Sequence, residues 1–383
     1  MYRLTEEGAE IARRAARVAG EVIAPAAAET DRSAAFPRAS LEALAREGFY
    51  GLTVPAAYGG MGRDLRTACA VLDEIARRCA STAMIYQMHL CAVATYVAAG
   101  ERMADLLREV AAGRHLATLA WSEVGSRSHF WAPVSRAARN GTGVTIRADK
   151  SFVTAAGEAD GYVVSTGWAE AETPLDTMLY LVRADDAGVR VRGRWDGLGM
   201  RGNASCPMVF EDVRVDAARA LSEEGRGLDV MLGVVLPSFM AGCAAISLGI
   251  CEAAVETTRR HLVAARNEHL GTNLAAVPSL RVQLARMRLE TDRARAHLVA
   301  VLDALESPGP ATQLLVLESK AAAGEAAITV TDLGMRACGG AAYARRLDLE
   351  RSFRDARASA VMAPTTEHIH DFIGRALCGM ELF

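Results

Sequence analysis

The chain has 383 residues, of which 51% are hydrophobic and 23% are charged, with a formal net charge of −3. This composition supports a sizeable core in two or three domains and excludes a predominantly disordered chain. The acidic balance, with no run of Lys and Arg, gives no electrostatic basis for binding nucleic acid, so we predict no nucleic-acid partner.

The eight cysteines are scattered, and none forms a Cys-x-x-Cys pair. This spacing indicates neither a zinc site nor a thioredoxin-like site, so we predict no metal centre. Most of them lie in apolar surroundings, where cysteine behaves as a small hydrophobe. The N-terminus is polar and has no apolar core of a signal peptide. We therefore predict a protein of the reducing cytoplasm.

Residues 1–112 are predicted to form a helical domain. Apolar residues recur at helical spacing from Leu4 to Ile23, and further helical stretches cover 40–48, 65–78 and 81–99. A Gly- and Pro-rich loop at 48–62 separates two of these stretches.

Residues 113–225 are predicted to form a β domain. Short apolar or alternating stretches occur between Gly- and Asp-containing turns, at 116–121, 143–147, 161–166, 177–182, 189–192 and 207–215. Several short strands with turn residues between them predict a small antiparallel barrel or sandwich.

Residues 226–383 are predicted to form a four-helix bundle. Long segments with apolar residues at helical spacing and short connections occur at about 228–265, 276–306, 311–338 and 364–378. Pro364 cannot continue a helix, and Thr365 or Thr366 is expected to cap the one that follows.

The first of these segments contains an uncharged stretch, Val230 to Cys251, that is long enough to span a bilayer. It contains Pro237 and small residues, and it has no basic flank. We interpret it as a buried helix of the bundle and predict no membrane association.

This order of domains, at this length, resembles the acyl-CoA dehydrogenase fold, over essentially the whole chain. Six motifs carry the resemblance in the family's order. They are the loop 52–62, the box Ser122–His129 (the family's Thr-Glu-Pro-Gly-x-Gly-Ser-Asp), Lys150–Thr154 (Lys-x-Trp-Ile-Thr), 198–202 with 210–215, Cys338-Gly-Gly340, and Arg354-Asp-Ala-Arg357.

The resemblance implies FAD bound at a dimer interface within a homotetramer. It places Trp121, Ser122 and Thr154 around the flavin ring, with Phe152 as an apolar platform. Ser128 would face the pyrophosphate, and Arg266 of a neighbouring subunit would neutralise it. The remaining implied contacts are Arg336, Gly339 and Gly340 for the adenine half, and Thr365 and Glu367 beside the flavin and adenosine. Taken singly, each also has an ordinary structural interpretation, as a cap, a solvated charge or a core residue.

The sequence departs from the family pattern at the catalytic base. Dehydrogenation needs a carboxylate that takes the α-proton of the thioester. The usual position of this Glu falls on Ala363, and the alternative position falls on Phe239. The family Arg that helps bind the CoA arm falls on Met240. In the box, Arg127 replaces the second Gly and His129 replaces Asp, which makes His129 a weak candidate acid or base.

Three functions remain open at this point. The first is α,β-dehydrogenation of an acyl thioester of CoA or an acyl carrier protein, with electrons passing to an acceptor flavoprotein or O2. The second is a flavin-dependent monooxygenase on the same scaffold, which needs no α-carbon base. The third is a catalytically inactive partner subunit, against which the retained flavin-side residues argue. We choose the first by family frequency.

Overall fold

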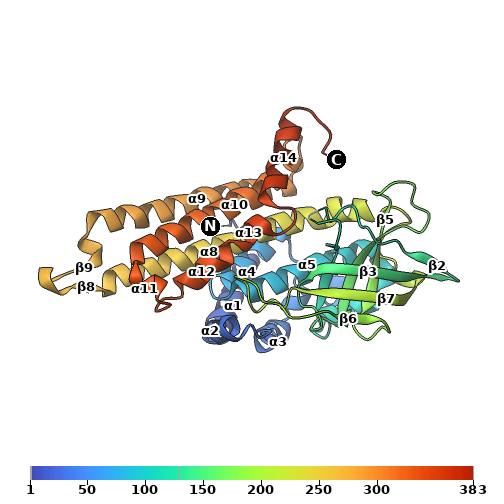
Figure 1. Ribbon diagram of the computed structural model, residues 1–383, viewed down its shortest axis with the longest axis horizontal. Coiled ribbons are helices and arrows are strands. Elements are labelled where there is room, and N and C mark those ends of the chain that lie inside the picture. Colours follow the sequence, from blue (N-terminus) through green and yellow to red (C-terminus); the bar gives the residue numbers. More distant parts are fainter. Residues whose placement is uncertain (1, 128, 383) are drawn as a thin grey trace.

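The computed structural model describes residues 2–127 and 129–382. It is elongated, with the β domain at one end and the long C-terminal helices running from it to the opposite end (Figure 1). The N-terminal helices pack along the middle of this axis. The predicted order of helical domain, β domain and helical domain is confirmed.

The N-terminal domain contains α1 (Glu6–Val18), α2 (Ala24–Ser33), α3 (Arg38–Arg46), α4 (Leu65–Ala76), α5 (Ala80–Ala99) and α6 (Ala104–Ala111). The Thr5 hydroxyl caps α1 by accepting from the Gly8 N–H, and Asp64 caps α4 in the same way. Helix α5 is buried around most of its circumference because it packs against α4, α8 and β1.

The β domain contains two sheets. One has the order β1-β4-β5, formed by Ala117–Ala120, Gly161–Gly167 and Thr177–Arg183. The other has the order β2-β3-β7-β6, formed by Ala138–Asn140, Gly143–Val153, Cys206–Asp216 and Val189–Val191. The prediction of a wholly antiparallel domain is wrong at one pair, because β1 and β4 are parallel. The chain crosses to the second sheet between them, and such a long connection permits parallel pairing.

The C-terminal domain begins with α7 (Gly227–Val230), a π-helical turn η6 (Met231–Val235) and α8 (Leu236–Ala264). A small hairpin of β8 (Arg266–Asn267) and β9 (Thr272–Asn273) leads to α9 (Pro278–Glu306) and α10 (Thr312–Cys338). The chain ends with α11 (Gly340–Tyr343), α12 (Leu349–Ala356), α13 (Ala358–Val361) and α14 (Thr366–Leu377).

The predicted fourth bundle helix exists as α14 but does not take the expected place. It packs mainly against α10 and stands away from the other long helices (Figure 1). The short helix α12 packs against both α8 and α10 instead. Its buried face is small, with Leu349 and Ala356, and its other residues are mostly charged, so its sequence indicated only a charged patch.

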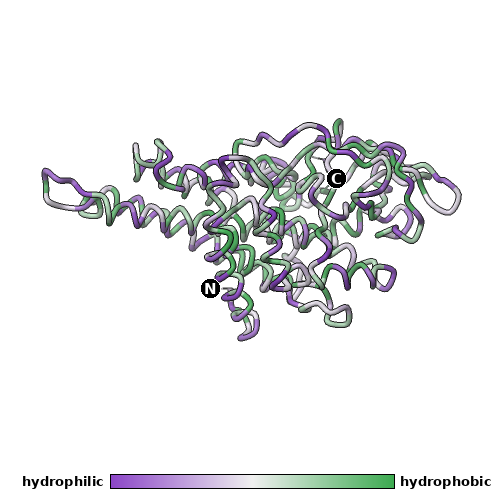
Figure 2. Tube along the Cα trace, turned by 90° about the horizontal axis from the view of Figure 1, so that it is seen from below, coloured by the Kyte–Doolittle hydropathy of each residue, from purple (hydrophilic) through white to green (hydrophobic). Residues whose placement is uncertain are grey.

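Hydrophobic residues gather in the middle of the molecule, whereas the hairpin at the far left is mostly hydrophilic (Figure 2). Two helical stretches, Ala80–Ala111 and Gly227–Ala264, are apolar and long enough to cross a membrane. Of their most hydrophobic windows, 78% and 72% are buried inside the molecule, as expected of core helices. The second contains the segment that we interpret as a buried helix.

Candidate active site

A cavity of about 510 Å³ lies between the β domain, the start of α8 and the turn from α13 to α14. Its size is typical of a pocket for a small molecule or cofactor. From the β domain it is lined by Trp121, Ser122, Phe152 and Thr154, which are four of the predicted flavin contacts. From the other side it is lined by Phe239 and Ala363, the two positions of the absent base. The fold therefore brings these four predicted flavin contacts and both predicted catalytic positions to one cavity.

The β-domain wall is held by a buried ion pair. Lys150 Nζ lies 2.7 Å from Glu123 Oε1, and the two side chains are 0% and 3% exposed. The same ammonium donates to the carbonyl oxygens of Ser165 (2.6 Å) and Trp121 (3.3 Å). Glu123 also accepts the backbone N–H groups of Val134 and Ser135 at 2.6 and 2.7 Å. Glu123 thus anchors the box Ser122–His129, and Trp121 is fixed at the cavity wall.

The electrostatics of this pair follow from its burial. Burial lowers the pKa of Lys150, and the Glu123 carboxylate opposes this effect. Burial raises the pKa of Glu123, but the Lys150 charge and the donated hydrogen bonds outweigh it, so the net shift is downward. The charge of each partner therefore favours the charged form of the other.

Three features of the β-domain wall fit a planar heteroaromatic ligand. The Phe152 side chain is 64% exposed although it is apolar, which leaves its ring available to pack against another molecule. The buried indole Nε1 of Trp121 and the buried Oδ1 of Asn203, which also lines the cavity, have no hydrogen-bond partner among the described residues. A buried donor and a buried acceptor left unpaired in one cavity indicate a ligand that offers both.

The opposite wall is the turn from Ser359 to Pro364, and it is held by Lys320 of α10. Lys320 Nζ donates to the carbonyl oxygens of Ser359 (2.8 Å), Pro364 (2.9 Å) and Met362 (3.1 Å). No carboxylate lies within ion-pair distance of this ammonium among the described residues. Burial lowers the pKa of Lys320 to about 8. The Ala363–Pro364 peptide bond is cis.

The turn leads directly into α14, whose N-cap is Thr365, one of the two residues expected to cap this helix. The Thr365 hydroxyl accepts from the His368 N–H at 3.3 Å. Glu367 is exposed in the first turn of the same helix, where the helix dipole stabilises a carboxylate. Contact of either residue with a cofactor stays a prediction.

Two of the sequence motifs meet beside the cavity. The Asp355 carboxylate accepts from the Met200 N–H at 2.6 Å, and Arg354 donates to the Leu198 carbonyl oxygen at 3.0 Å. A Cβ atom on Gly199 would lie only 2.5 Å from the Arg354 carbonyl oxygen, so only glycine fits this approach. Burial raises the pKa of Asp355 to about 6.

The lining contains no carboxylate among the described residues, and its single charged side chain is Arg127. Phe239 and Ala363 line the cavity as apolar groups, and Met240, where the family has Arg, is completely buried. The His129 ring lies 5.1 Å from that of His368 and 5.0 Å from that of Trp131, and His129 is not among the lining residues. Its role as an acid or base stays a prediction.

The remaining predicted cofactor residues lie at the opposite end of the molecule. Arg266 is in β8, and Arg336, Gly339 and Gly340 are at the junction of α10 and α11, far from the β domain (Figure 1). Arg266 is exposed and makes only a long hydrogen bond, 3.4 Å, to the Gly271 carbonyl oxygen and a 4.0 Å contact with Glu268. Ser128 lies outside the described residues.

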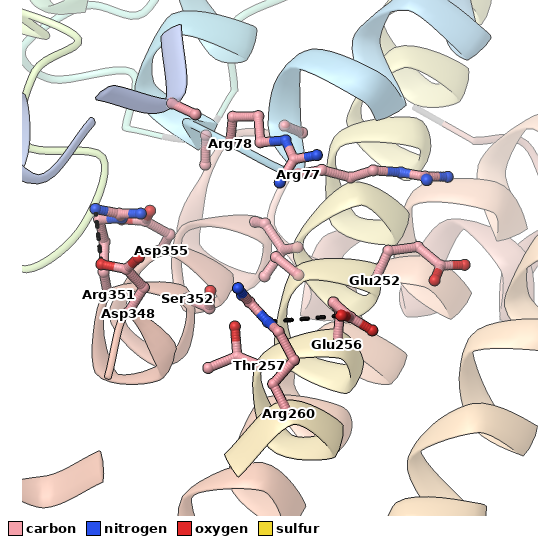
Figure 3. Close-up of a pocket in the computed structure, with 15 residues that line it drawn as sticks. Arg77, Arg78, Glu252, Glu256, Thr257, Arg260, Asp348, Arg351, Ser352 and Asp355 are labelled. Carbon is pink, nitrogen blue, oxygen red and sulfur yellow. Dashed lines mark ion pairs between the residues drawn. The ribbon is translucent and has the colours of Figure 1, made fainter. Parts of the chain in front are cut away.

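A second cavity, of about 400 Å³, lies between α4, α8 and α12 and has a different character (Figure 3). Two of its arginines pair with lining carboxylates, Arg260 with Glu256 at 3.5 Å and Arg351 with Asp348 at 3.4 Å. It contains none of the predicted cofactor residues. No cluster of His, Cys, Asp and Glu suited to a metal ion occurs in residues 2–127 and 129–382.

Sequence reasoning missed Lys320, Trp195, Asn203 and the η6 turn, of which Met231 and Val235 line the cavity. Lys320 carried a usable signal. It lies at helical spacing with the buried residues Val316, Ala323 and Ala327, so a lysine occupies the core face of a helix. A charge in that position requires buried partners.

Proteins of known family resemble this chain in sequence over nearly its whole length. The chain is 27% identical over 382 residues to a probable acyl-CoA dehydrogenase, fadE25, of Mycobacterium leprae, covering 98% of this chain and 97% of that one. It is 28% identical over 390 residues to a 3-sulfinopropanoyl-CoA desulfinase of Paraburkholderia xenovorans, covering 100% and 98%.

Among solved structures, butyryl-CoA dehydrogenase from Megasphaera elsdenii superposes with a TM-score of 0.92 at 22% identity, covering 98% of this chain and 99% of that one. The prolyl acyl carrier protein oxidase AnaB gives 0.87 at 20% identity and covers 98% and 99%. PigA with FAD and proline gives 0.90 at 19% identity and covers 99% of each chain.

Models of the acyl-CoA dehydrogenase N-terminal, middle and C-terminal domains match residues 5–114, 118–213 and 225–378. The three matches follow the domain order of the structure and leave only short segments unmatched. The chain therefore belongs to the acyl-CoA dehydrogenase family.

Proposed function

We propose that this protein is an FAD-dependent oxidoreductase that introduces an α,β double bond into an acyl thioester. The observation that carries the proposal is the single cavity that joins Trp121, Ser122, Phe152 and Thr154 with the start of α8 and the α13–α14 turn. The family membership and the thioester-named relatives support the same reaction. No feature of this chain specifically favours hydroxylation.

The cavity fits the isoalloxazine end of FAD. A flavin has a planar ring for Phe152, and its edge offers both an acceptor for the Trp121 indole N–H and a donor for the Asn203 side-chain Oδ1. The Ser122 and Thr154 hydroxyls add polar groups to the same wall. When bound, FAD supplies the acceptor for the hydride that leaves the substrate's β-carbon.

We infer that the adenosine and phosphate end of FAD is held by a second copy of the chain, in a homotetramer. Arg266, Arg336, Gly339 and Gly340 lie too far along the molecule to serve the cavity of their own chain. The end of α8, the hairpin and the first half of α9 also carry exposed apolar side chains. These are Val263 (53%), Leu270 (60%), Val282 (58%) and Leu289 (54%). Such a group is typical of a subunit contact.

The handling of the α-proton distinguishes this chain from the family pattern. Ala363 and Phe239 offer no proton acceptor, and the described lining holds no carboxylate. The chain's own contribution is an apolar wall, formed by Phe239, Met362 and Ala363, against which the thioester is oriented beside the flavin. We infer that the α-proton passes to a water molecule or a buffer base that enters from the open side of the cavity, because the described lining offers no carboxylate to take it. CoA and a carrier protein both remain open as the thioester handle.

The direct test is anaerobic mixing of the FAD-loaded protein with a panel of acyl-CoA and acyl carrier protein thioesters. We expect loss of the flavin's visible absorbance and formation of an enoyl product with at least one of them. An unchanged flavin spectrum with every thioester that demonstrably binds would reject the proposal.

We infer that the reduced flavin passes its electrons to an acceptor flavoprotein or to O2. We infer that this takes place in the cytoplasm, where the eight free cysteines would stay reduced.

Ala363→Glu tests the catalytic half of the cavity. A correctly placed base accelerates proton transfer by about 10²–10⁴-fold. We therefore expect at least a tenfold faster flavin reduction by a simple saturated acyl-CoA than in the native protein. Ala358→Glu, on the same cavity wall, is the matched control and should give no gain. No gain from Ala363→Glu in a variant that still binds FAD and thioester would show that the turn does not face the α-carbon.

A further inference from the structure

We propose that Arg127 binds an anionic group of the thioester substrate and so determines which substrates this cavity accepts. This inference deepens the function proposed above and rests on it. The shared chemistry is that of a phosphate or a carboxylate, and either could come from the substrate. The two sources are the phosphate of a phosphopantetheine arm and an acid group carried by the acyl chain.

The first argument is the isolation of the charge. Arg127 lines the cavity, and every other lining residue that the structure describes is uncharged. Its guanidinium makes no hydrogen bond or ion pair with any residue that the structure describes, although most arginines of this chain have a carboxylate partner. A guanidinium presents a planar set of N–H donors suited to carboxylate or phosphate. An anion that enters this cavity therefore meets one cation and no competing carboxylate.

The second argument is position. Arg127 is exposed, so it lies where the cavity opens to solvent, whereas Met88 and Met231, which also line it, are buried. A thioester that enters with its acyl end among the apolar residues leaves its arm at this opening. An acyl chain that bends back toward the opening could present an acid group to the same side chain. Both sources are thus compatible with one cation at the rim.

The third argument is the backbone. Arg127 has φ of +52°, a left-handed conformation that side chains other than glycine adopt at a cost of about 1 kcal/mol. Described residues on both sides of Arg127 are held in place, because Glu123 pairs with Lys150 and the His129 N–H donates to the Ser126 carbonyl oxygen at 3.0 Å. Seven other described non-glycine residues, among them Arg3 and Arg345, also have a positive φ, so this conformation supports the proposal only together with the two preceding arguments.

The test measures binding to the FAD-loaded protein rather than turnover, by the change in the flavin absorption spectrum. Four non-natural probes separate the sources: butyryl pantetheine, butyryl phosphopantetheine, glutaryl pantetheine and glutaryl phosphopantetheine. They differ only in the arm phosphate and the acyl carboxylate. The variants are Arg127→Gln, Arg127→Lys and, as a matched control, Arg46→Gln, an exposed arginine at the end of α3.

We expect at least one anionic probe to bind the native protein about 10–100-fold more tightly than its neutral counterpart, the range for a charged hydrogen-bonded contact. Arg127→Gln should abolish this preference without weakening butyryl pantetheine, Arg127→Lys should keep part of it, and Arg46→Gln should keep all of it. A preference for the phosphate probes would identify the arm phosphate as the group that Arg127 binds. A preference for the glutaryl probes would identify the acid group of the acyl chain.

Two results would overturn the proposal. One is an equal affinity of the native protein for all four probes. The other is a loss on Arg127→Gln that is confined to FAD affinity, measured by titrating the apoprotein, because the cation would then serve the cofactor. Failure of the dehydrogenation would be seen separately, as a thioester that binds without changing the flavin's redox state.

Discussion

Lys150 and Lys320 are the only lysines in the sequence, both are 1% exposed, and each holds one wall of the same cavity. They do so by different means. Lys150 has a carboxylate partner, Glu123, whereas Lys320 is bound only by backbone carbonyl oxygens. The β-domain wall, which carries the predicted flavin contacts, is therefore held by an ion pair whose two charges neutralise each other. The α13–α14 turn, where the family base is missing, is held by a buried cation that forms no ion pair with any described carboxylate.

The largest expected effect comes from breaking the paired wall. Glu123→Gln leaves the Lys150 ammonium buried without its counter-charge, which costs about 3–5 kcal/mol of unfolding free energy. Denaturant unfolding followed by circular dichroism measures this loss. Glu211→Gln, in an exposed ion pair with Arg190, is the control and should cost less than about 1 kcal/mol. Similar losses in the two variants would contradict the importance of the buried pair.

The unpaired wall should be the weaker of the two. Lys320→Met removes the donor of three hydrogen bonds and leaves three carbonyl oxygens to find other partners, at a cost of about 2–4 kcal/mol. The same denaturant experiment checks this value, with Glu325→Gln, exposed on the same helix, as the control. A loss equal to that of Glu123→Gln or larger would reverse the ranking of the walls.

Titration separates the two lysines further. The pKa of Lys320 is about 8 in the folded state, below the ordinary lysine value of about 10.4, so the unfolded chain binds more protons between these values. The contribution of Lys320 to stability therefore rises with pH through this window, by up to about 1.4 kcal/mol per unit of pKa shift. The difference in unfolding free energy between the native protein and Lys320→Met should increase from pH 7 to pH 10. A difference in unfolding free energy that does not change with pH would mean that folding does not lower the pKa of Lys320.

The smallest effect concerns Trp121, whose position the Lys150 pair fixes. Trp121→Phe removes a buried N–H without a partner, so the stability of the apoprotein should stay within about 1 kcal/mol of the native value or rise. FAD affinity should fall by about 3–10-fold if the N–H donates to the flavin. Equal FAD affinity of the two proteins would show that the indole N–H does not contact the cofactor.

The sequence predicted those features that depend on local chemistry or on motif order. A cap at Thr365 or Thr366 could be predicted from a hydroxyl that follows a proline. The domain order and the strands β3–β7 could be predicted from the periodicity of apolar residues within short windows. The convergence of Trp121, Phe152, Phe239 and Ala363 on one cavity followed from the family resemblance. It could not have been derived from spacing, because these residues come from three separate parts of the chain.

The features that the sequence did not predict depend on distant partners. Lysine is normally exposed, and the partners of Lys150 and Lys320 lie up to 44 residues away. The parallel pairing of β1 with β4 is decided by the path of the chain between them. The position of α12 is decided by Leu349 and Ala356 fitting between α8 and α10, a match of shapes that its charged sequence conceals.

The burial of both lysines has a practical consequence. The folded chain presents no lysine amine to solvent, so an amine-directed reagent can reach Lys150 or Lys320 only when the surrounding structure opens. Each of the two labelling rates, resolved by peptide mapping, therefore reports the opening of one wall of the cavity. We expect Lys320 to be labelled faster than Lys150, because the wall that it holds should open more often.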